Sequence, residues 1–149
     1  MTRALAAVAV LGTGILAGVL VSVARAIAPT FLVLPGERYV QVHQLLDRRF
    51  DPLMPILSAV TTVQVVVLVV VGDYPVRVLY VTTLVLIGLM AAVSGVVNVP
   101  INRKVLAWDP ADPPADWADL RIRWTRWNLA RTVCAVGAFA ASTSALVLW

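Results

Sequence analysis

Four long, uncharged and mostly apolar runs dominate the pattern of hydrophobic and polar positions in this chain. The runs extend over residues 4–24, 52–72, 78–102 and 132–149. Each is close to the roughly 20 residues that an α-helix needs to cross about 30 Å of hydrocarbon. The pattern therefore predicts an all-α integral membrane four-helix bundle, formed by a single domain over residues 1–149. Its spans are expected at about residues 4–25, 52–72, 77–99 and 129–149.

The first connection is long enough to hold structure of its own. Residues 26–35 form a further apolar stretch that contains Pro29 and Pro35 and is too short to span a membrane. We expect it to be an interfacial or re-entrant segment that covers one end of the bundle. Residues 37–50 have the pattern of a helix whose face carries Tyr39, His43, Asp47 and Phe50.

Composition and charge agree with a membrane location. The chain is 60% hydrophobic and only 13% charged, whereas soluble domains carry roughly 25% charged residues. Its net charge of +4 is compatible with nucleic-acid binding, but the basic residues flank the apolar runs, where anionic headgroups attract them. We therefore expect membrane lipids as partners and no nucleic acid.

The chain has one cysteine, Cys134, and one histidine, His43. It can form no intrachain disulfide, and one chain cannot supply the ligands of an ordinary zinc or iron–sulfur site. We therefore expect no metal site.

The first apolar run also has to be weighed as a signal peptide. It follows Arg3 and ends in Ala24-Arg25-Ala26, which offers small residues for a cleavage site. The uncharged stretch is longer than the roughly 7 to 15 residues of a signal-peptide core. We therefore favour a retained first span.

Lys and Arg are distributed unevenly between the two sides of the predicted bundle. The side with both termini and the second connection carries only Arg3 and Arg77 of the 12 basic residues. The other side carries the first and third connections and all remaining basic residues. By the positive-inside rule, we predict a multi-pass protein of a bacterial inner membrane with both termini outside the cytoplasm.

Two sets of small residues are suited to close helix packing. Gly14 and Gly18 form a GxxxG pair in the first span, and Gly88, Ala92 and Gly95 share one face of the third. Such faces let helix backbones approach closely. We favour packing within the chain, and a homo-oligomer through Gly14 and Gly18 is the alternative.

Most of the candidate site residues lie around the connection between the third and fourth spans. Asn98 and Asn102 are four residues apart, so their amides stack on one helix face, and Pro100 removes a backbone donor between them. On the last helix, a stripe with alternating spacings of four and three contains Trp117, Arg121, Trp124, Asn128 and Arg131. Trp127 lies beside this stripe.

Structural roles explain part of the stripe. Tryptophans form interfacial belts, and Arg121 has the position of a cytoplasmic anchor. Asn128 and Arg131 lie deeper, where a charged side chain faces the protein interior and pairs there. We predict that they line a polar pocket, with Asn98 and Asn102 as partners.

These motifs resemble those of the DUF1772, or anthrone-oxygenase-like, integral membrane proteins. The resemblance rests on Asn98-x-Pro100-x-Asn102, a short acidic and proline-bearing linker, and Arg123-Trp124-x-x-Trp127-Asn128-x-x-Arg131. It implies a four-span membrane fold. Characterised fungal members oxidise anthrones to anthraquinones with molecular oxygen and without an evident organic cofactor. The resemblance therefore implies an oxidoreductase that acts on a hydrophobic aromatic small molecule and needs no cofactor.

The residues are chemically compatible with such an oxidation. An anthrone is a flat, weakly acidic ketone, and a base that removes its proton makes an enolate able to react with oxygen. His43 is the only side chain whose ordinary pKa suits that role at neutral pH, and Asp47, one turn later, can orient its ring. The remaining candidates are expected to bind the ligand, either by stacking on its rings or by stabilising its oxyanion. They are Asn98, Asn102, Arg121, Trp124, Trp127, Asn128 and Arg131.

The sequence leaves other interpretations open. His43 can simply make a hydrogen bond in an interfacial helix. The amide-rich basic mouth can hold a lipid headgroup, a quinone or another amphiphile without turnover. The chain can also be a structural accessory subunit that binds a partner through Gly14 and Gly18.

Overall fold

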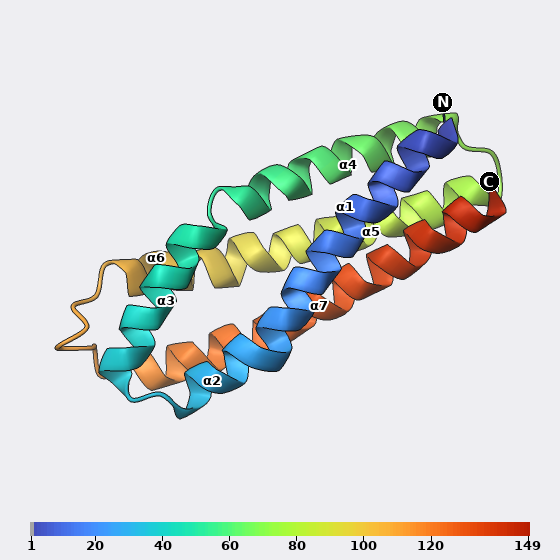
Figure 1. Ribbon diagram of the computed structural model, residues 1–149. Coiled ribbons are helices and arrows are strands. Elements are labelled where there is room, and N and C mark those ends of the chain that lie inside the picture. Colours follow the sequence, from blue (N-terminus) through green and yellow to red (C-terminus); the bar gives the residue numbers. More distant parts are fainter. Residues whose placement is uncertain (1) are drawn as a thin grey trace.

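The structure is a computed structural model that describes residues 2–149 (Figure 1). Four of its helical segments are long and apolar enough to cross a membrane. They are Thr2–Val33, Leu53–Val71, Val76–Leu106 and Trp117–Leu148. The predicted all-α membrane bundle is confirmed, and the chain is a multi-pass integral membrane protein.

A short π-helical turn divides two of these segments. The first consists of α1 (Thr2–Ser22), η1 (Val23–Ile27) and α2 (Ala28–Val33), and the third consists of α5 (Val76–Val93), η2 (Ser94–Asn98) and α6 (Val99–Leu106). The second and fourth are α4 (Leu53–Val71) and α7 (Trp117–Leu148). The additional helix expected in the first connection is α3 (Gly36–Phe50).

The half of the bundle that carries both chain ends is formed by α1, α4, α5 and most of α7 (Figure 1). We call it the terminal half. In it, α7 packs against α5 and α1, and α4 lies against the same two helices. The core between α1 and α7 contains small side chains, since Ala6, Ala9 and Ala138 are at most 1% exposed. Small side chains allow the close backbone contact that drives helix association in lipid.

Two glycines of α1 make close contacts within the chain. Gly12 lies so near Thr61 of α4 that a Cβ atom at this position would clash with the threonine side chain. Gly14 lies against the ring of Phe139 on α7. The GxxxG spacing pointed to Gly14 but not to Gly12, which is the tighter of the two contacts.

The other small residues of the sequence motifs face outward. A Cβ atom added to Gly18, Gly88 or Gly95 would have no neighbouring atom of residues 2–149 within 4 Å, and Ala92 is exposed. The interpretation of the Gly88 face as an intrachain contact is therefore wrong, because α5 turns that face away from the other helices. Self-association through Gly14 and Gly18 stays a prediction.

Residues 26–35 do not form the separate cover that the sequence suggested. They continue the first helix to Val33, and η1 lies directly before the turn that contains Pro29. Proline lacks the N–H that an α-helix needs and clashes with the carbonyl four residues earlier, and a π-helical turn can absorb this misfit. The helix therefore continues and places Phe31 against Tyr39 and His43 of α3.

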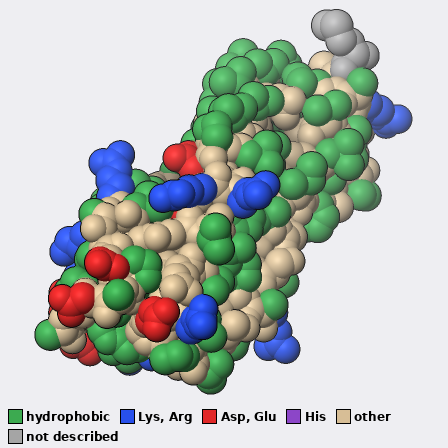
Figure 2. Space-filling view, turned by 60° about the vertical axis from the view of Figure 1, so that its left-hand side comes forward, with side chains coloured by type: hydrophobic (Ala, Val, Ile, Leu, Met, Phe, Trp, Pro, Cys, Tyr) green, Lys and Arg blue, Asp and Glu red, His purple; other side chains and the backbone are tan. Residues whose placement is uncertain are grey.

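Pro100 has the same relation to η2, which ends at Asn98. Both π-helical turns lie toward one end of the bundle, where α2, α3, α6 and the first turns of α7 come together (Figure 1). We call this region the polar end. Figure 2 shows that acidic and basic side chains gather there, whereas the opposite half of the visible face is largely apolar. The polar end is thus the part of the molecule that contains candidate chemistry.

Candidate functional site

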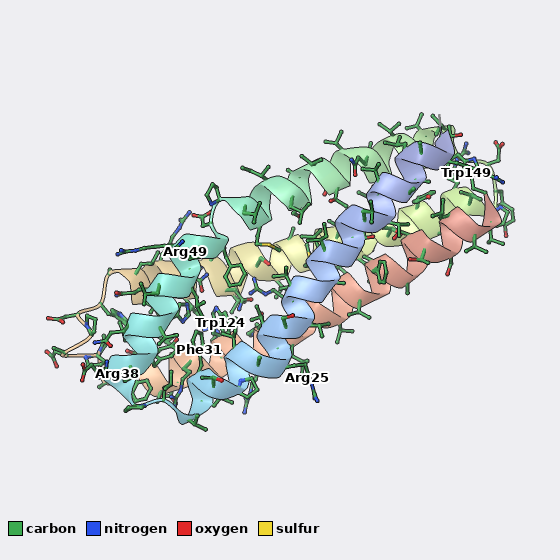
Figure 3. All side chains as sticks on the ribbon, in the orientation of Figure 1. Arg25, Phe31, Arg38, Arg49, Trp124 and Trp149 are labelled. Carbon is green, nitrogen blue, oxygen red and sulfur yellow. The ribbon has the colours of Figure 1, made fainter. Side chains whose placement is uncertain are left out.

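The candidate site lies where α3 packs on α6 in the polar end. His43 of α3 is only 2% exposed. Its ring stacks on Phe31 at a centroid distance of 5.1 Å and makes edge contacts with Tyr39 and Trp124 at 5.4 and 5.3 Å. Figure 3 shows Phe31 and Trp124 directed toward the interior between α2, α3 and α7. Aromatic rings thus surround the imidazole.

Asn102 of α6 is the centre of the hydrogen-bond network around this imidazole. Its Oδ1 atom accepts from Trp124 Nε1 at 2.8 Å and lies 3.2 Å from Nε2 of His43. Its Nδ2 atom donates to Oδ1 of Asp47 at 2.6 Å. The suggested direct contact between Asp47 and His43 is therefore replaced by an amide bridge. Asn102 on the neighbouring helix occupies the space between these two side chains of α3.

Burial keeps the imidazole neutral. It lowers the pKa of His43 from 6.5 to about 4, and the hydrogen bond with Asn102 opposes this shift. The pKa of the Asp47 carboxyl is raised by burial and then by the charge of Asp51, while Asn102 and Arg131 act in the opposite direction. Within residues 2–149, Nδ1 of His43 has no hydrogen-bond partner. The site therefore contains an uncharged base whose Nδ1 atom is buried and unpaired within residues 2–149.

Arg131 enters this region from the apolar part of α7. Its Nε and Nη2 atoms donate to Oδ1 of Asn128 at 3.0 and 2.8 Å, and Nη1 donates to Oγ of Ser94 at 3.4 Å. The guanidinium carbon lies 5.8 Å from the ring centroid of Trp124. Trp124 is thus a neighbour of both the imidazole and the guanidinium group.

The two amides on the third segment have other partners. Asn98 donates to the backbone carbonyl of Trp124 at 3.1 Å, and Asn102 serves the network around His43. The expected hydrogen bonds from Arg131 to these amides are therefore absent among the described residues. Helical side chains point toward the N-terminus of their helix, which brings Arg131 to Asn128 on the preceding turn.

Some buried polar atoms of α7 and η2 have no partner among residues 2–149. Asn98 and Asn128 are fully buried, yet Oδ1 of Asn98 and Nδ2 of Asn128 make no hydrogen bond there. The same holds for the hydroxyl of Thr125. A buried polar atom left unpaired costs about 1 to 3 kcal/mol. These atoms can therefore serve a polar ligand or an ordered water.

Arg121 has a structural position. Its Nη1 atom donates to the backbone carbonyls of Phe31 and Leu34 at 2.7 and 2.8 Å, where α2 ends. Its guanidinium carbon also lies 4.4 Å from the ring centroid of Trp117. A cation is favourable at a helix C-terminus, where carbonyls lack partners. Arg121 thus fastens the end of the first helical segment to the start of α7.

Trp127 lies outside the network and is 41% exposed. Arg123 and Arg126 on the same helix are exposed as well. These three residues fit the aromatic belt and basic anchor of a membrane interface. The structure therefore brings together His43, Asp47, Asn102, Trp124, Asn128 and Arg131, but not Trp127.

The sequence profile of a family described as Anthrone oxygenase matches residues 43–141. This match covers well over half of the chain. The chain belongs to the anthrone oxygenase family. The match confirms the resemblance drawn from the C-terminal motifs, and it begins at His43. No curated protein and no solved structure matched the chain in the same comparisons.

In this anthrone oxygenase family member, three residues of the polar end were not predicted from the sequence. Phe31 gave no signal, because it lies in an unpatterned apolar stretch. Ser94 precedes Asn98 by four residues and continues the stripe of Asn98 and Asn102, so its position was recognisable. Gln44 donates to the carbonyls of Val105 and Trp108 at 2.9 and 3.0 Å and joins α3 to the end of α6.

Proposed function

We propose that this member of the anthrone oxygenase family oxidises a flat aromatic ketone or phenol with molecular oxygen and uses His43 as the general base. The observation that carries this proposal is a buried neutral imidazole in aromatic surroundings, whose Nδ1 has no partner in the described part of the chain. Such surroundings suit a flat, apolar and weakly acidic substrate. The family match supports the reaction class.

The proposed reaction starts when His43 accepts a proton from the acidic position of the substrate. The resulting enolate transfers one electron to O2, and the substrate radical and superoxide combine to form a carbon–oxygen bond. The proton held by His43 then converts the peroxide anion to a hydroperoxide, which loses water and leaves a new carbonyl group. An anthrone thus consumes one O2 and yields one quinone and one water, with no external reductant and no organic cofactor.

Arg131 and Asn128 are the proposed groups that stabilise the substrate oxyanion. Among residues 2–149, Asn128 has an unpaired Nδ2 donor, and only Asn128 and Ser94 contact the positive charge of Arg131 through hydrogen bonds. Donors fixed before the reaction stabilise developing charge most strongly where water is excluded. Trp124 neighbours both His43 and Arg131 and is the proposed stacking surface.

The other residues expected to bind the ligand receive different proposed roles. Asn102 positions the base, and Asn98 offers its Oδ1, which no described residue binds, to a hydroxyl group of the ligand. Arg121 and Trp127 are not included in the proposed site, because Arg121 caps α2 and Trp127 lies at the surface.

We also propose that the polar end faces the cytoplasm of a bacterial cell, because it holds most of the basic residues. The test uses the Ala111→Cys substitution in a Cys134→Ala background, since Ala111 lies exposed between α6 and α7. A membrane-impermeant thiol reagent should label this cysteine in inverted vesicles and not in intact cells. Labelling in intact cells would reverse the proposed orientation.

The proposed activity is tested with an anthrone in membranes that contain the protein and in matched membranes that lack it. Oxygen uptake and quinone formation should both depend on the protein and should occur in equal amounts. Release of hydrogen peroxide instead of incorporation of oxygen would contradict the reaction. Tight binding of the anthrone without oxygen uptake would indicate a binding protein and contradict the proposed enzyme.

A further inference from the structure

A neutral imidazole can carry its proton on either ring nitrogen, and only the other nitrogen can then act as a base. Around His43 this choice depends on Asn102, whose Oδ1 lies 3.2 Å from Nε2 of the ring. An asparagine amide presents either an acceptor or a donor to a given neighbour, according to its orientation. The orientation of Asn102 therefore decides which imidazole tautomer fits.

Two neighbours of fixed polarity set the orientation of Asn102. The indole N–H of Trp124 can only donate, and it lies 2.8 Å from Oδ1 of the amide. The side chain of Asp47 offers an acceptor oxygen 2.6 Å from Nδ2. If the amide were reversed, its NH2 group would face the indole N–H and its oxygen would face the carboxylate. Both contacts would become repulsive, so each neighbour alone favours the observed orientation.

The consequence for His43 follows from the same geometry. Nε2 meets an acceptor oxygen and must carry the proton to form a hydrogen bond with it. Nδ1 is then the unprotonated nitrogen, and it is also the ring nitrogen without a partner among the described residues. The face of the ring stacks on Phe31 with 14° between the planes, which helps to hold the ring in this position.

We propose that Asn102, oriented jointly by Asp47 and Trp124, locks His43 in the tautomer that has its proton on Nε2 and leaves the buried Nδ1 with a free electron pair. Asn102, Asp47 and Trp124 are positioning residues in this arrangement. The proposal deepens the proposed function, and it rests on that function only for the use of Nδ1 as the catalytic base.

The tautomer can be read directly, because the chain contains one histidine. The full-length protein labelled with ¹⁵N-histidine in lipid nanodiscs should give one pair of imidazole nitrogen signals. Near neutral pH we expect a protonated, pyrrole-type shift for Nε2 and an unprotonated, pyridine-type shift for Nδ1. Intermediate shifts from exchange between tautomers, a proton on Nδ1 or a doubly protonated ring would each overturn the proposal.

Variants show whether Asn102 and its neighbours fix the tautomer, or whether the imidazole ring prefers this tautomer by itself. Asn102→Leu should move both shifts toward the values of exchanging tautomers. Trp124→Phe and Asp47→Asn, each as a single variant, should leave the tautomer of His43 fixed, because the remaining neighbour still orients the amide of Asn102. The double variant should release the tautomer. Release by either single variant would contradict joint orientation. Gln44→Leu is the matched control, since this amide also joins α3 to α6 but contacts neither His43 nor Asn102 through a hydrogen bond.

Oxygen uptake by the same samples distinguishes this proposal from the proposed function. A locked Nε2–H tautomer in a wild-type protein that shows no turnover would contradict the proposed function and leave the lock intact. Turnover by a wild-type protein whose imidazole exchanges freely between tautomers would contradict the lock alone. If both proposals hold, Asn102→Leu should release the fixed tautomer and lower turnover together, because a smaller share of the imidazole then has Nδ1 unprotonated.

Discussion

The terminal half and the polar end of this bundle handle their buried polar groups in different ways. In the terminal half, hydroxyls mostly return to their own helix, as Thr83 does when it donates to the carbonyl of Leu79 at 2.9 Å. In the polar end, amides and guanidinium groups bond across helices, as Asn102 does to α3 and α7 and Arg121 does to α2. Local pairing is compatible with almost any apolar bundle, whereas cross-helix pairing fixes the relative positions of particular side chains.

We therefore expect the terminal half to contribute to stability and the polar end to contain the chemistry. Substitutions in the terminal half should alter packing and leave turnover per folded molecule unchanged. Substitutions of His43, Asn102 or Arg131 in the polar end should alter turnover even where the fold persists.

After the replacement of His43, the largest effect on turnover is expected from the replacement of Arg131. If Arg131 stabilises the oxyanion, Arg131→Leu should lower kcat by about 10²- to 10³-fold, the usual effect of removing one such donor. The protein should still fold, because leucine is less costly than a charge in this apolar part of α7. Arg126→Leu removes an exposed arginine from the same helix and serves as the control. Equal losses in the two variants would contradict a specific role of Arg131.

The second prediction concerns acid stability, and it follows from the pKa of His43. Folding lowers this pKa from 6.5 to about 4, so the unfolded chain binds more protons between these two values. The free energy of unfolding should therefore fall as the pH falls from 6.5 to about 4, by about 3 kcal/mol in total.

His43→Gln isolates this contribution. The raised pKa of Asp47 has the opposite effect on the free energy of unfolding in the pH range where this carboxyl titrates. The variant keeps Asp47 and therefore keeps that effect. Equilibrium unfolding in detergent at a series of pH values should show a shallower acid slope for His43→Gln than for the wild type. Identical slopes would contradict a buried, neutral His43.

The third prediction concerns the junction between α2 and α7. Arg121→Met should lower the free energy of unfolding by about 1.5 to 3 kcal/mol, because it removes hydrogen bonds from a charged group to two carbonyls. Arg123→Met, an exposed neighbour, should change it by less than about 0.5 kcal/mol. Thermal or denaturant unfolding measures both. A similarly small change in the free energy of unfolding for both variants would indicate that Arg121 is only a membrane anchor.

The smallest expected effect lies in the terminal half. Thr13 and Ser142 share a buried hydroxyl–hydroxyl hydrogen bond of 2.8 Å between α1 and α7. Thr13→Val should cost about 0.6 kcal/mol, which is typical of such bonds between membrane helices. Oxygen uptake per folded molecule should stay at the wild-type level. A loss of turnover without a loss of folded protein would show that the two halves are coupled.

The sequence was sufficient for the parts of the fold that depend on length and periodicity. The four apolar runs predicted the spans, and the one-face pattern of Tyr39, His43 and Asp47 predicted α3. The continuation of the first helix past Pro29 was not predicted, because a proline normally ends or bends a helix and nothing local announces a π-helical turn. That continuation is what brings Phe31 to His43.

The candidate site was predicted as a set of residues but not as a network. Spacing placed Asn98 and Asn102 on one face and Asn128 and Arg131 on another, and such periodicity describes single helices. Partners across helices depend on how helices rotate and cross, which periodicity does not encode. The sequence therefore could not reveal that Asn102 stands between His43 and Asp47.

The most direct test of the central assignment is turnover by His43→Gln in the same membranes as the wild type. Glutamine keeps an N–H group that can donate to Asn102, but its amide is not a base at any accessible pH. We predict that oxygen uptake with an anthrone falls by about 10²- to 10⁴-fold, while the amount of folded protein stays the same. Turnover at the wild-type rate would contradict the assignment of His43 as the base.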